Sequence, residues 1–344
     1  MKLTDWSEIE KTLKRKHLLL GNGASIAIDS RLSYHSLYEQ VCNTGKLKVS
    51  LLNMFDSFKT SNFEFIMRLL LEASQVNNAL NIEEDKTKNY YYELREALIS
   101  TVRDIHPQYA DVEPFLIPIA KFLAKFRVVF SLNYDLVVYW AMLAGNNKLG
   151  ALLAGDSKLE CQWFKDCFVN GGFKKDFQYM YYSLPPAKGS TLVFYPHGNL
   201  FLATDIYGDE LKLSRSKEDY LLEEVLSRWQ EKDYLPLFVS EGITSEKYRA
   251  IARSDYLSTV YDSILRKFSG SLVIYGWSAS DQDEHIFGAI DHKDINGIAI
   301  SVHTKNPQWE SHCEKIEDRL ARTRHLKEIP TFFFDSTCKG CWIY

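Results

Sequence analysis

Long apolar runs are absent from this sequence. No stretch approaches the roughly 20 apolar residues that a helix needs to cross a membrane. The opening residues, MKLTDWSEIEKTLKRK, also lack the apolar core and the small-residue cleavage site of a secretory signal. We therefore expect a cytosolic protein with no membrane attachment.

Cysteine is scarce. The 344 residues contain six cysteines, at positions 42, 161, 167, 313, 338 and 341. That number is too small for a disulfide scaffold in a chain of this length, so reduced thiols are expected. The pair Cys338 and Cys341 has Cys-x-x-Cys spacing but no second pair, and Cys161 and Cys167 have poor zinc-finger spacing. We expect no metal site.

Blocks of like charge are missing too. The chain has 41 Lys and Arg and 45 Asp and Glu, which are interspersed and give a net charge of −4 and a pI near 6.2. This pattern provides no electrostatic footprint for nucleic acid or for an anionic membrane. A small soluble ligand is the expected partner, and no direct nucleic-acid binding is evident.

What the sequence does contain is a series of short apolar runs. The chain is 46% hydrophobic and 14% aromatic, enough for one large core with room for a smaller lobe. Most runs stop at glycine or polar residues before a helical pattern, as buried parallel strands do. The repetition predicts an α/β fold, a Rossmann-like parallel sheet flanked by helices. The runs are residues 17–20, 127–130, 191–195, 235–239, 271–275, 297–302 and 329–334.

The pattern also predicts how the chain is divided. Residues 1–31, 125–143 and 189–344 form the expected nucleotide-binding core, within one compact unit. Residues 32–124 are helical almost throughout and are interpreted as an insertion after the first strand, with a capping box at Ser61-x-x-Glu64. Residues 144–188 mix glycines with aromatics and are interpreted as a second, smaller insertion.

Polar and glycine residues gather at four strand ends. They are the segments Gly21 to Ser25, Ser131 to Asp135, Pro196 to Gly198, and Gly276 to Ser278. In open parallel sheets the ligand lies beyond the carboxyl ends of the strands, so these segments indicate one site.

The first of these segments is a weak signal by itself. Gly21 and Gly23 allow a pyrophosphate to approach the backbone, next to the free N–H groups of a helix N-terminus. The full dinucleotide fingerprint fails, because Ile26 stands where glycine or alanine is needed and no acidic residue follows a second strand at the expected distance. A tight strand-to-helix connection is the alternative. We expect Gly23→Val to block phosphate binding while the fold persists.

Taken together and in order, the four segments resemble the glycine motif, the Gln-Asn-Ile-Asp motif, the His-Gly motif and the Gly-x-Ser loop of the sirtuin superfamily. The chain looks like a divergent, bacterial-type sirtuin-like protein. Residues 236–242, followed by Lys247 and Tyr256, also look similar to one uncharacterised sirtuin-like family. The resemblance implies a nucleotide-binding fold with NAD as substrate.

The resemblance also implies residue roles. Asn133 would orient a water or a ribose hydroxyl beside the nicotinamide ribose, and His197 would be the general base; these two form the expected catalytic pair. Asp135 would receive the nicotinamide amide. The remaining expected NAD-binding residues are Gly21, Asn22, Gly23, Ala24 and Ser25 at the phosphates, Gly276 and Ser278 along the adenosine half, and Asp281.

Structural interpretations of these residues stay open. Asn133 and Asp135 also suit a turn held by Asx hydrogen bonds, and His197 suits a structural histidine. Asp281, with Glu284 three residues on, equally suits a helix N-cap. Leu132 replaces the family's glutamine, and residues 28–31 stand where the family has a Gly-Ile-Pro-Asp-Phe-Arg loop.

The expected reaction follows from what the family's deacetylases have and this chain lacks. Those enzymes carry a zinc ribbon with two cysteine pairs between the His-Gly motif and the Gly-x-Ser loop, whereas residues 198–275 contain no cysteine. The resemblance therefore implies an NAD glycohydrolase that releases nicotinamide and ADP-ribose. It also implies NAD depletion in bacterial anti-phage defence, restrained by a partner subunit, homo-oligomerisation or a nucleotide signal. The alternatives are a non-catalytic NAD- or ADP-ribose-binding regulatory subunit and an ADP-ribosyltransferase.

Overall fold

The protein has an α/β fold built around a parallel sheet. The computed structural model describes residues 2–33, 37–83, 85–149, 164–175, 190–213, 220–231, 234–239 and 244–344. Within them, the main sheet has seven strands in the order β12-β11-β10-β1-β2-β6-β3, and every neighbouring pair is parallel. This arrangement confirms the Rossmann-like sheet flanked by helices. The strands are β1 (Lys16–Leu20), β2 (Val128–Ser131), β3 (Phe164–Lys165), β6 (Thr191–Phe194), β10 (Gly270–Tyr275), β11 (Ile295–Val302) and β12 (Thr331–Asp335).

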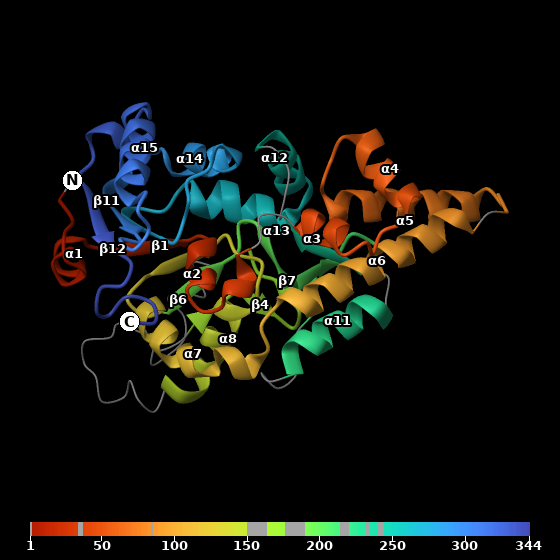
Figure 1. The fold of residues 1–344 in the computed structure, drawn as a ribbon, viewed down its shortest axis with the longest axis horizontal. Helices are drawn as coiled ribbons and strands as arrows, with labels where there is room; N and C mark the ends of the chain where they lie inside the picture. Colours follow the sequence, from red (N-terminus) through yellow and green to blue (C-terminus); the bar gives the residue numbers. More distant parts are fainter. Residues whose placement is uncertain are drawn as a thin grey trace.

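The central strands are buried on both faces. Every residue of β2, β6 and β10 is buried, which explains why these segments are nearly continuous apolar runs rather than alternating ones. Helices α14 and α15 lie on one side of the sheet, and α7 and α8 lie on the other (Figure 1). The helices that connect or flank the core strands are α1 (Trp6–Thr12), α2 (Asn22–Ile26), α8 (Val137–Ala144), η2 (Gly145–Leu149), α14 (Glu284–Ile290), α15 (Trp309–Ala321) and η6 (Leu326–Glu328).

The strand order reverses direction next to β1. From β1 the chain moves to β2 on one side, whereas β10, β11 and β12 extend the sheet on the other. The last residues of β1 and β10, Leu20 and Tyr275, are register partners, so the loops that follow both strands leave the sheet side by side. Such a switch point is where open α/β sheets bind ligands.

The residues between β1 and β2 that the structure describes contain only helices. Helices α5 and α6 form an antiparallel hairpin that extends away from the sheet, with α11 beside α6 (Figure 1). The helix α5 is capped by Asn62, whose side chain accepts from the Phe65 N–H, so the capping box expected at Ser61-x-x-Glu64 is wrong and the cap lies one residue later. The elements of this region are η1 (Ser30–Leu32), α3 (Leu37–Asn43), α4 (Val49–Phe58), α5 (Phe63–Ala79), α6 (Lys86–Ile105) and α7 (Tyr109–Leu123).

A separate antiparallel sheet was not anticipated. Its order is β4-β5-β8-β7-β9, and β9 (Leu235–Phe238), interpreted from the sequence as one more strand of the β/α alternation, pairs antiparallel with β7 (Gly198–Thr204). The segment interpreted as a smaller insertion is divided between the sheets, because β3 joins the edge of the parallel sheet. Its residues 150–163 and 176–188 lie outside the described residues. The other strands are β4 (Phe168–Val169), β5 (Gly172–Phe173) and β8 (Glu210–Lys212).

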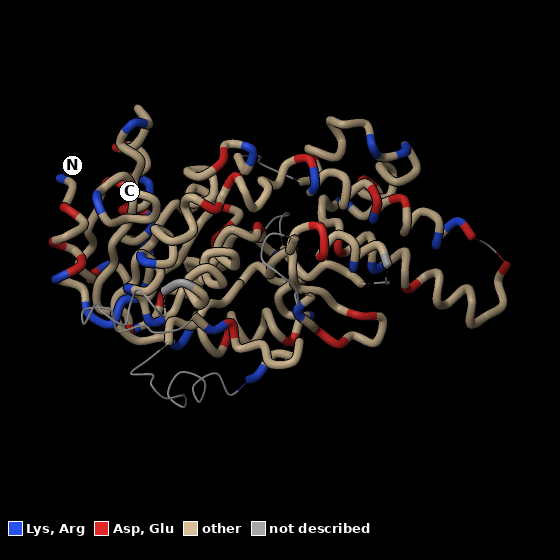
Figure 2. The backbone as a smooth tube through the Cα atoms, turned by 90° about the horizontal axis from the view of Figure 1, so that it is seen from below, with Lys and Arg blue, Asp and Glu red and all other residues tan. Residues whose placement is uncertain are grey.

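Of the remaining helices, α11 lies between β8 and β9 of the antiparallel sheet, and the others lead from β9 back to β10. These helices are α11 (Leu221–Glu231), α12 (Thr244–Arg253), α13 (Asp255–Ser258) and the π-helix η4 (Thr259–Leu265). Basic and acidic residues are mixed along the backbone rather than gathered by sign (Figure 2). Among the described residues, no helix is both long and apolar enough to cross a membrane.

Candidate functional site: a cavity at the strand switch point

The four strand-end segments meet around one cavity. It has a volume of about 730 Å³ and lies at the carboxyl ends of the central strands, where the strand order reverses. Each segment contributes to its wall, although they are far apart in the sequence. The expected site residues that line it are Gly21, Asn22, Gly23, Asn133, Asp135, His197, Gly276 and Ser278.

The two glycine loops pack directly on each other. Gly23 N–H donates to the Gly276 carbonyl at 2.7 Å, and Gly21 N–H donates to the Tyr275 carbonyl at 2.9 Å. A Cβ atom at Gly21 would lie 2.5 Å from the Trp277 Cα. Gly276 has φ of +67°, and a Cβ there would meet the Ala24 backbone nitrogen. These glycines are therefore required for loop packing, whatever they bind.

This packing corrects one expectation. A Cβ at Gly23 would lie 2.8 Å from the Gly276 carbonyl oxygen, which is backbone and cannot rotate away. Gly23→Val must therefore disturb the fold as well as any phosphate site. The N–H groups of Gly21 and Gly23 already have protein acceptors, which leaves phosphate binding there a prediction.

Two of the expected phosphate contacts lie behind the cavity wall. Ala24 and Ser25 are fully buried and do not line the cavity. The Ala24 carbonyl instead accepts from Trp342 Nε1 at 2.8 Å, so the C-terminal segment braces the short helix α2. Tyr344, two residues on, lines the cavity itself.

Asn133, Ser25 and Asp135 form a buried hydrogen-bonded chain. Asn133 Nδ2 donates to the Gly21 carbonyl at 3.2 Å and to Ser25 Oγ at 2.8 Å. Ser25 Oγ in turn donates to Asp135 Oδ2 at 2.6 Å. The second carboxylate oxygen, Oδ1, accepts from Val137 N–H at 2.9 Å, which is the Asx turn considered from the sequence. The same two side chains thus hold the loop and line the cavity.

The loop after β2 is also held from behind. Asn199 Nδ2 donates to the carbonyls of Asn133 and Asp135, at 3.3 and 2.8 Å. His106 Nε2 accepts from Leu136 N–H at 3.0 Å, while His106 Nδ1 faces the Pro107 carbonyl at 2.8 Å. Burial lowers the pKa of His106, which keeps its ring neutral and able to accept.

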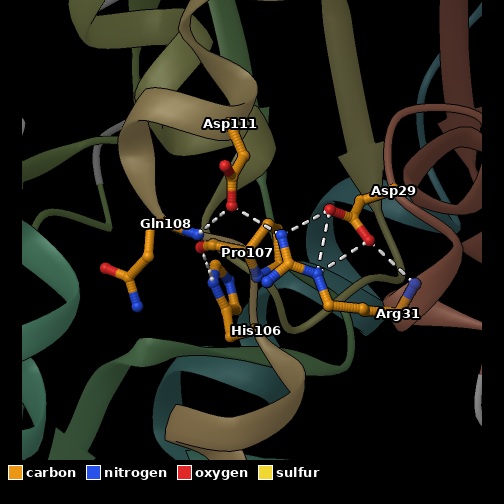
Figure 3. Close-up of polar contacts among 6 residues, drawn as sticks. All are labelled: Asp29, Arg31, His106, Pro107, Gln108 and Asp111. Atoms are coloured by element: carbon orange, nitrogen blue, oxygen red, sulfur yellow. Dashed lines mark hydrogen bonds and ion pairs between the residues drawn. The ribbon is translucent and has the colours of Figure 1, made fainter.

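A cluster of charged residues ties this region to the helices (Figure 3). Arg31 binds both Asp29 oxygens and also pairs with Asp111 at 2.5 Å, and Asp111 accepts from Gln108 N–H at the start of α7. Asp29 and Arg31 stand where the sirtuin-like loop is missing. Their side chains bond to each other and to α7, and neither lines the cavity.

His197 reaches the cavity from the loop after β6. The following residue, Gly198, has φ of +74°, and a Cβ there would meet the Leu237 carbonyl. Packing alone therefore requires glycine after His197. His197 is 5% exposed and makes a 2.8 Å Nε2-to-Nε2 contact with His285. Burial, with the nearby Lys247 ammonium, holds the pKa of His197 well below 6.5. The imidazole is therefore neutral at pH 7, as a general base must be.

Three ionisable groups near His197, two of them buried and Asp283 partly buried, were not predicted as site residues from the sequence. Asp283 accepts from Lys247 Nζ and from Trp277 Nε1, both at 2.9 Å. Burial disfavours the Asp283 carboxylate, but electrostatic interaction with His197 and Lys247 and the hydrogen bonds from Lys247 and Trp277 outweigh it and bring the pKa of Asp283 to about 2. The sequence pointed to Lys247 only through the resemblance to an uncharacterised sirtuin-like family. It could not point to His285, because His285 lies 88 residues from His197 and belongs to no recognisable motif.

Asp281 proves to be the wrong acidic residue of its segment. Its side chain is fully exposed, pairs with Arg319 at 3.4 Å and does not line the cavity. The N-cap of the short helix η5 (Asp281–Asp283) is Ser280, so the capping alternative is also incorrect. Asp283, two residues later, is the acidic side chain that faces the cavity.

His197, Asp283 and His285 are metal-ligand types gathered in one place. One potential ligand atom from each lies within 4.8 Å of the others. Both Asp283 oxygens, however, already accept hydrogen bonds, and the Lys247 ammonium supplies positive charge at that carboxylate. A divalent cation there would face direct repulsion, so the arrangement suits a proton better than a metal.

The far end of the cavity is formed by β11, α15 and the C-terminal segment. None of its lining residues was predicted, because they follow no recognisable motif. They present hydroxyl, amide, imidazole and aromatic side chains to the cavity. The residues are Ser301, His303, Asn306, Trp309, His312, Ser336 and Tyr344.

Comparison with protein families places the whole of this architecture in one family. The profile described as "Domain of unknown function (DUF4917)" matches residues 18–342. The chain belongs to the DUF4917 family. The DUF4917 match begins within β1 and ends at residue 342, so it includes both sheets and every residue that lines the cavity except Tyr344. No curated protein matches the chain. The DUF4917 description itself assigns no ligand or reaction.

Proposed function

We propose that the cavity binds NAD and that the protein hydrolyses the nicotinamide–ribose bond, giving nicotinamide and ADP-ribose. One observation carries the proposal: Asn133, Asp135 and His197 line a single cavity together with the glycine loops, in the combination that resembles sirtuin-like proteins. The cavity volume of about 730 Å³ also falls within the range of about 300–1,000 Å³ typical of small-molecule sites.

The reaction asks little of the protein beyond positioning and one base. Water attacks C1′ of the nicotinamide ribose, and the bond from C1′ to the pyridinium nitrogen breaks with its electron pair going to that nitrogen. Nicotinamide leaves neutral, and the attacking water gives up one proton. His197, neutral at pH 7, is the proposed acceptor, and Asn133 is the proposed orienting group for the water.

The buried hydrogen bonds support this assignment of roles. Asn133 donates to Gly21 and Ser25, which fixes its amide against the cavity wall. Asp135, itself fixed by Ser25 and Val137, offers a carboxylate to the nicotinamide amide. Groups held in this way provide the preorganisation on which such catalysis depends.

A second candidate function has a specific observation in its favour. Both functional nitrogens of the proposed catalytic pair are occupied by protein, since Asn133 Nδ2 bonds to Ser25 and His197 Nε2 bonds to His285. A non-catalytic subunit that binds NAD or ADP-ribose and regulates a partner needs neither nitrogen free. The glycine loops and Asp135 would serve that subunit equally well.

The test is nicotinamide release by the purified protein, compared with Asn133→Ala and His197→Ala. Acid–base assistance contributes about 10²–10⁴-fold, so each substitution should slow release by at least about tenfold. The matched controls are Asn78→Ala and His325→Ala, which alter residues outside the cavity and should leave release unchanged. Folding is checked by circular dichroism.

The outcomes separate the candidate functions. Loss of release with retained NAD-dependent thermal shift supports hydrolysis. Thermal shift without release by the wild-type protein, alone or with its genomic neighbours, would favour the regulatory subunit. Label from NAD appearing on a macromolecule would indicate ADP-ribosyl transfer. NAD depletion in phage defence, restrained by a partner or by oligomerisation, is the biological setting that we propose for the hydrolase.

A further inference from the structure

The segment after β12 carries the Cys-x-x-Cys pair of the sequence in a tight turn. Cys341 N–H donates to the Cys338 carbonyl at 3.1 Å, and Gly340, the third residue of this turn, has φ of +86°, as a type II turn requires. The ends of a β-turn lie less than about 7 Å apart at Cα, and a disulfide joins Cα atoms about 4.4–6.8 Å apart. The backbone therefore already holds the two cysteines at about the separation of a disulfide.

The two thiols differ in their access to solvent. Both are free in the structure; Cys338 is half-buried and packs against the core, whereas Cys341 is fully buried. Burial raises the pKa of the Cys341 thiol, and the neighbouring Cys338 raises it further. An oxidant in solution can therefore reach Cys338 first, while Cys341 can react only with the sulfur at the other end of its own turn.

A cation contacts the same turn. Lys125 Nζ donates to the Gly340 carbonyl, which lies between the two cysteines, at 3.0 Å. Positive charge beside a cysteine favours the thiolate, which is the form that attacks a disulfide. Glu10 pairs with Lys125 at 3.2 Å and, together with Asp5, offsets part of this charge, whereas the exposed Lys339 within the turn adds to it. Lys125 thus places positive charge directly on the cysteine turn.

The turn leads directly into the brace behind the cavity wall. Trp342 follows Cys341, and its Nε1 donates to the Ala24 carbonyl of α2 at 2.8 Å. Trp342 has φ of +46°, a left-handed conformation that a residue other than glycine keeps only when its surroundings hold it. Tyr344, which lines the cavity, donates its N–H to the Cys341 carbonyl at 2.7 Å. The conformation of the cysteine turn therefore sets where Trp342 and Tyr344 lie.

We propose that Cys338 and Cys341 are a reversible dithiol that small-molecule disulfides oxidise, and that the bridge stiffens the brace on α2. The Cys338 thiolate attacks one sulfur of the small disulfide, which forms a mixed disulfide and releases one small thiolate. Cys341, as its thiolate, then attacks the Cys338 sulfur and releases the second. The two protons lost by the cysteines go to the two released thiolates. One small disulfide is thus reduced to two thiols as one protein disulfide forms.

The expected effect is stiffening because the bridge spans about the same distance as the turn that it closes. It restricts opening of the backbone at residues 338–341 rather than redirecting it, since cross-linking removes open conformations of the loop. A bridge in a short and partly exposed turn is also of the labile kind that regulates, rather than the resistant kind that builds a scaffold. None of these steps involves NAD, so the proposal stands apart from the proposed hydrolysis.

The first experiment equilibrates the full chain with oxidised and reduced glutathione at several ratios and reads the peptides by mass spectrometry. In the wild-type protein the peptide with both cysteines should lose the mass of two hydrogens, and reduction should restore it. Cys341→Ala should trap glutathione on Cys338, and Cys338→Ser should give neither product. Cys42→Ser, which alters a half-buried cysteine in α3, is the matched control and should still bridge. No bridge at the most oxidising ratio, or glutathione that persists on Cys338 of the wild-type protein, would overturn the proposal.

The second experiment compares hydrogen exchange of the reduced and the bridged protein, with β10 as the internal reference that should not change. Amides of the cysteine turn and of α2 should exchange roughly tenfold more slowly after bridging, the scale expected when a short loop is cross-linked. Trp342→Phe removes the donor to Ala24, so bridging should then slow the turn but not α2. Unchanged exchange in α2 of the wild-type protein would overturn the action through the brace, and faster exchange would show that the bridge distorts the turn instead of stiffening it.

Discussion

The two halves of the cavity wall are built on different principles. At the end of β1 and β10, backbone packs on backbone and the residue types are fixed by the space available, as at Gly21 and Gly276. At the end of β6 and the start of α14, ionisable groups whose charges and protons must balance lie in the wall, as at Asp283, and behind it, as at His285. The comparison teaches that the residue types of a motif can be required by packing in one half of a site and by charge and proton balance in the other.

We call the wall at β1 and β10 the steric half and the wall at β6 and α14 the chemical half. The largest expected loss of stability is that of Gly276→Ala, in the steric half. This change adds left-handed strain and a backbone clash with Ala24, so a loss of about 3 kcal/mol or more in the free energy of unfolding is expected. The matched control is Gly288→Ala in α14, where nothing lies within 4 Å of the new Cβ. There the helix should gain about 0.5–1 kcal/mol. Denaturant unfolding measures both, and a tolerated Gly276→Ala would contradict the packing argument.

The chemical half should respond to Asp283→Asn almost as strongly. The substitution leaves the Lys247 ammonium buried without its carboxylate, which costs about 3 kcal/mol in comparable pairs. Adding Lys247→Met should recover much of that loss, because the stranded charge is then removed. A double-mutant cycle on the free energy of unfolding checks this, and additive losses would show that the two side chains are not coupled.

A pH series sharpens the chemical side of the comparison. The pKa of His285 is lowered to about 4, so below pH 6.5 the unfolded state binds more protons than the folded state. Stability should therefore fall as the pH drops from 7 to 5, by about 2 kcal/mol for a group shifted this far. His285→Gln should show a correspondingly shallower fall over the same range.

The wild-type and Gln curves must be compared directly, because His17, whose pKa burial also lowers to about 4, contributes to both. Asp283 adds no slope in this window, since its depressed pKa matters only as the pH falls below its ordinary value of 3.8. Parallel curves between pH 7 and 5 would show that His285 does not titrate as described.

The smallest effect is expected at Asp281. Its side chain is fully exposed and its only partner in the described structure is Arg319, at the surface. Asp281→Ala should leave the melting temperature and nicotinamide release unchanged within error, in contrast to Asp283→Asn two residues away. A marked loss of release would restore Asp281 to the site.

The sequence predicted the steric half better than the chemical half. Short apolar runs that end at glycine or polar residues located β1, β2, β6, β10, β11 and β12 to within about two residues, because the strands inside a parallel sheet are buried on both faces and need such a run. The same pattern could not show that β9 belongs to another sheet, since an apolar run carries no information about its partner. Asn62, not Ser61, caps α5. Both residue types suit a cap, and the cap is the one whose extended backbone directly precedes the helix, which the residue types do not reveal.

The chemical half escaped prediction because its members are joined only by the fold. Asp283 was passed over for Asp281, since no local pattern says which carboxylate of a short helical turn faces inward. His285 contacts His197 from α14, and Lys247 bonds to Asp283 from a separate helix, α12. The four strand ends were found because parallel strands bring their carboxyl ends to one edge, which is a rule of topology rather than of local sequence.

The bond between Trp342 and Ala24 joins residues 318 positions apart. A ribosome adding about 5–20 residues each second needs roughly 15 to 65 seconds to make that interval. During this time the nascent chain has its glycine turn but not the brace behind it, nor the part of the cavity wall that Tyr344 supplies. The wall of the cavity therefore cannot be complete until residues 342–344 have been made, long after the glycine turn that they support.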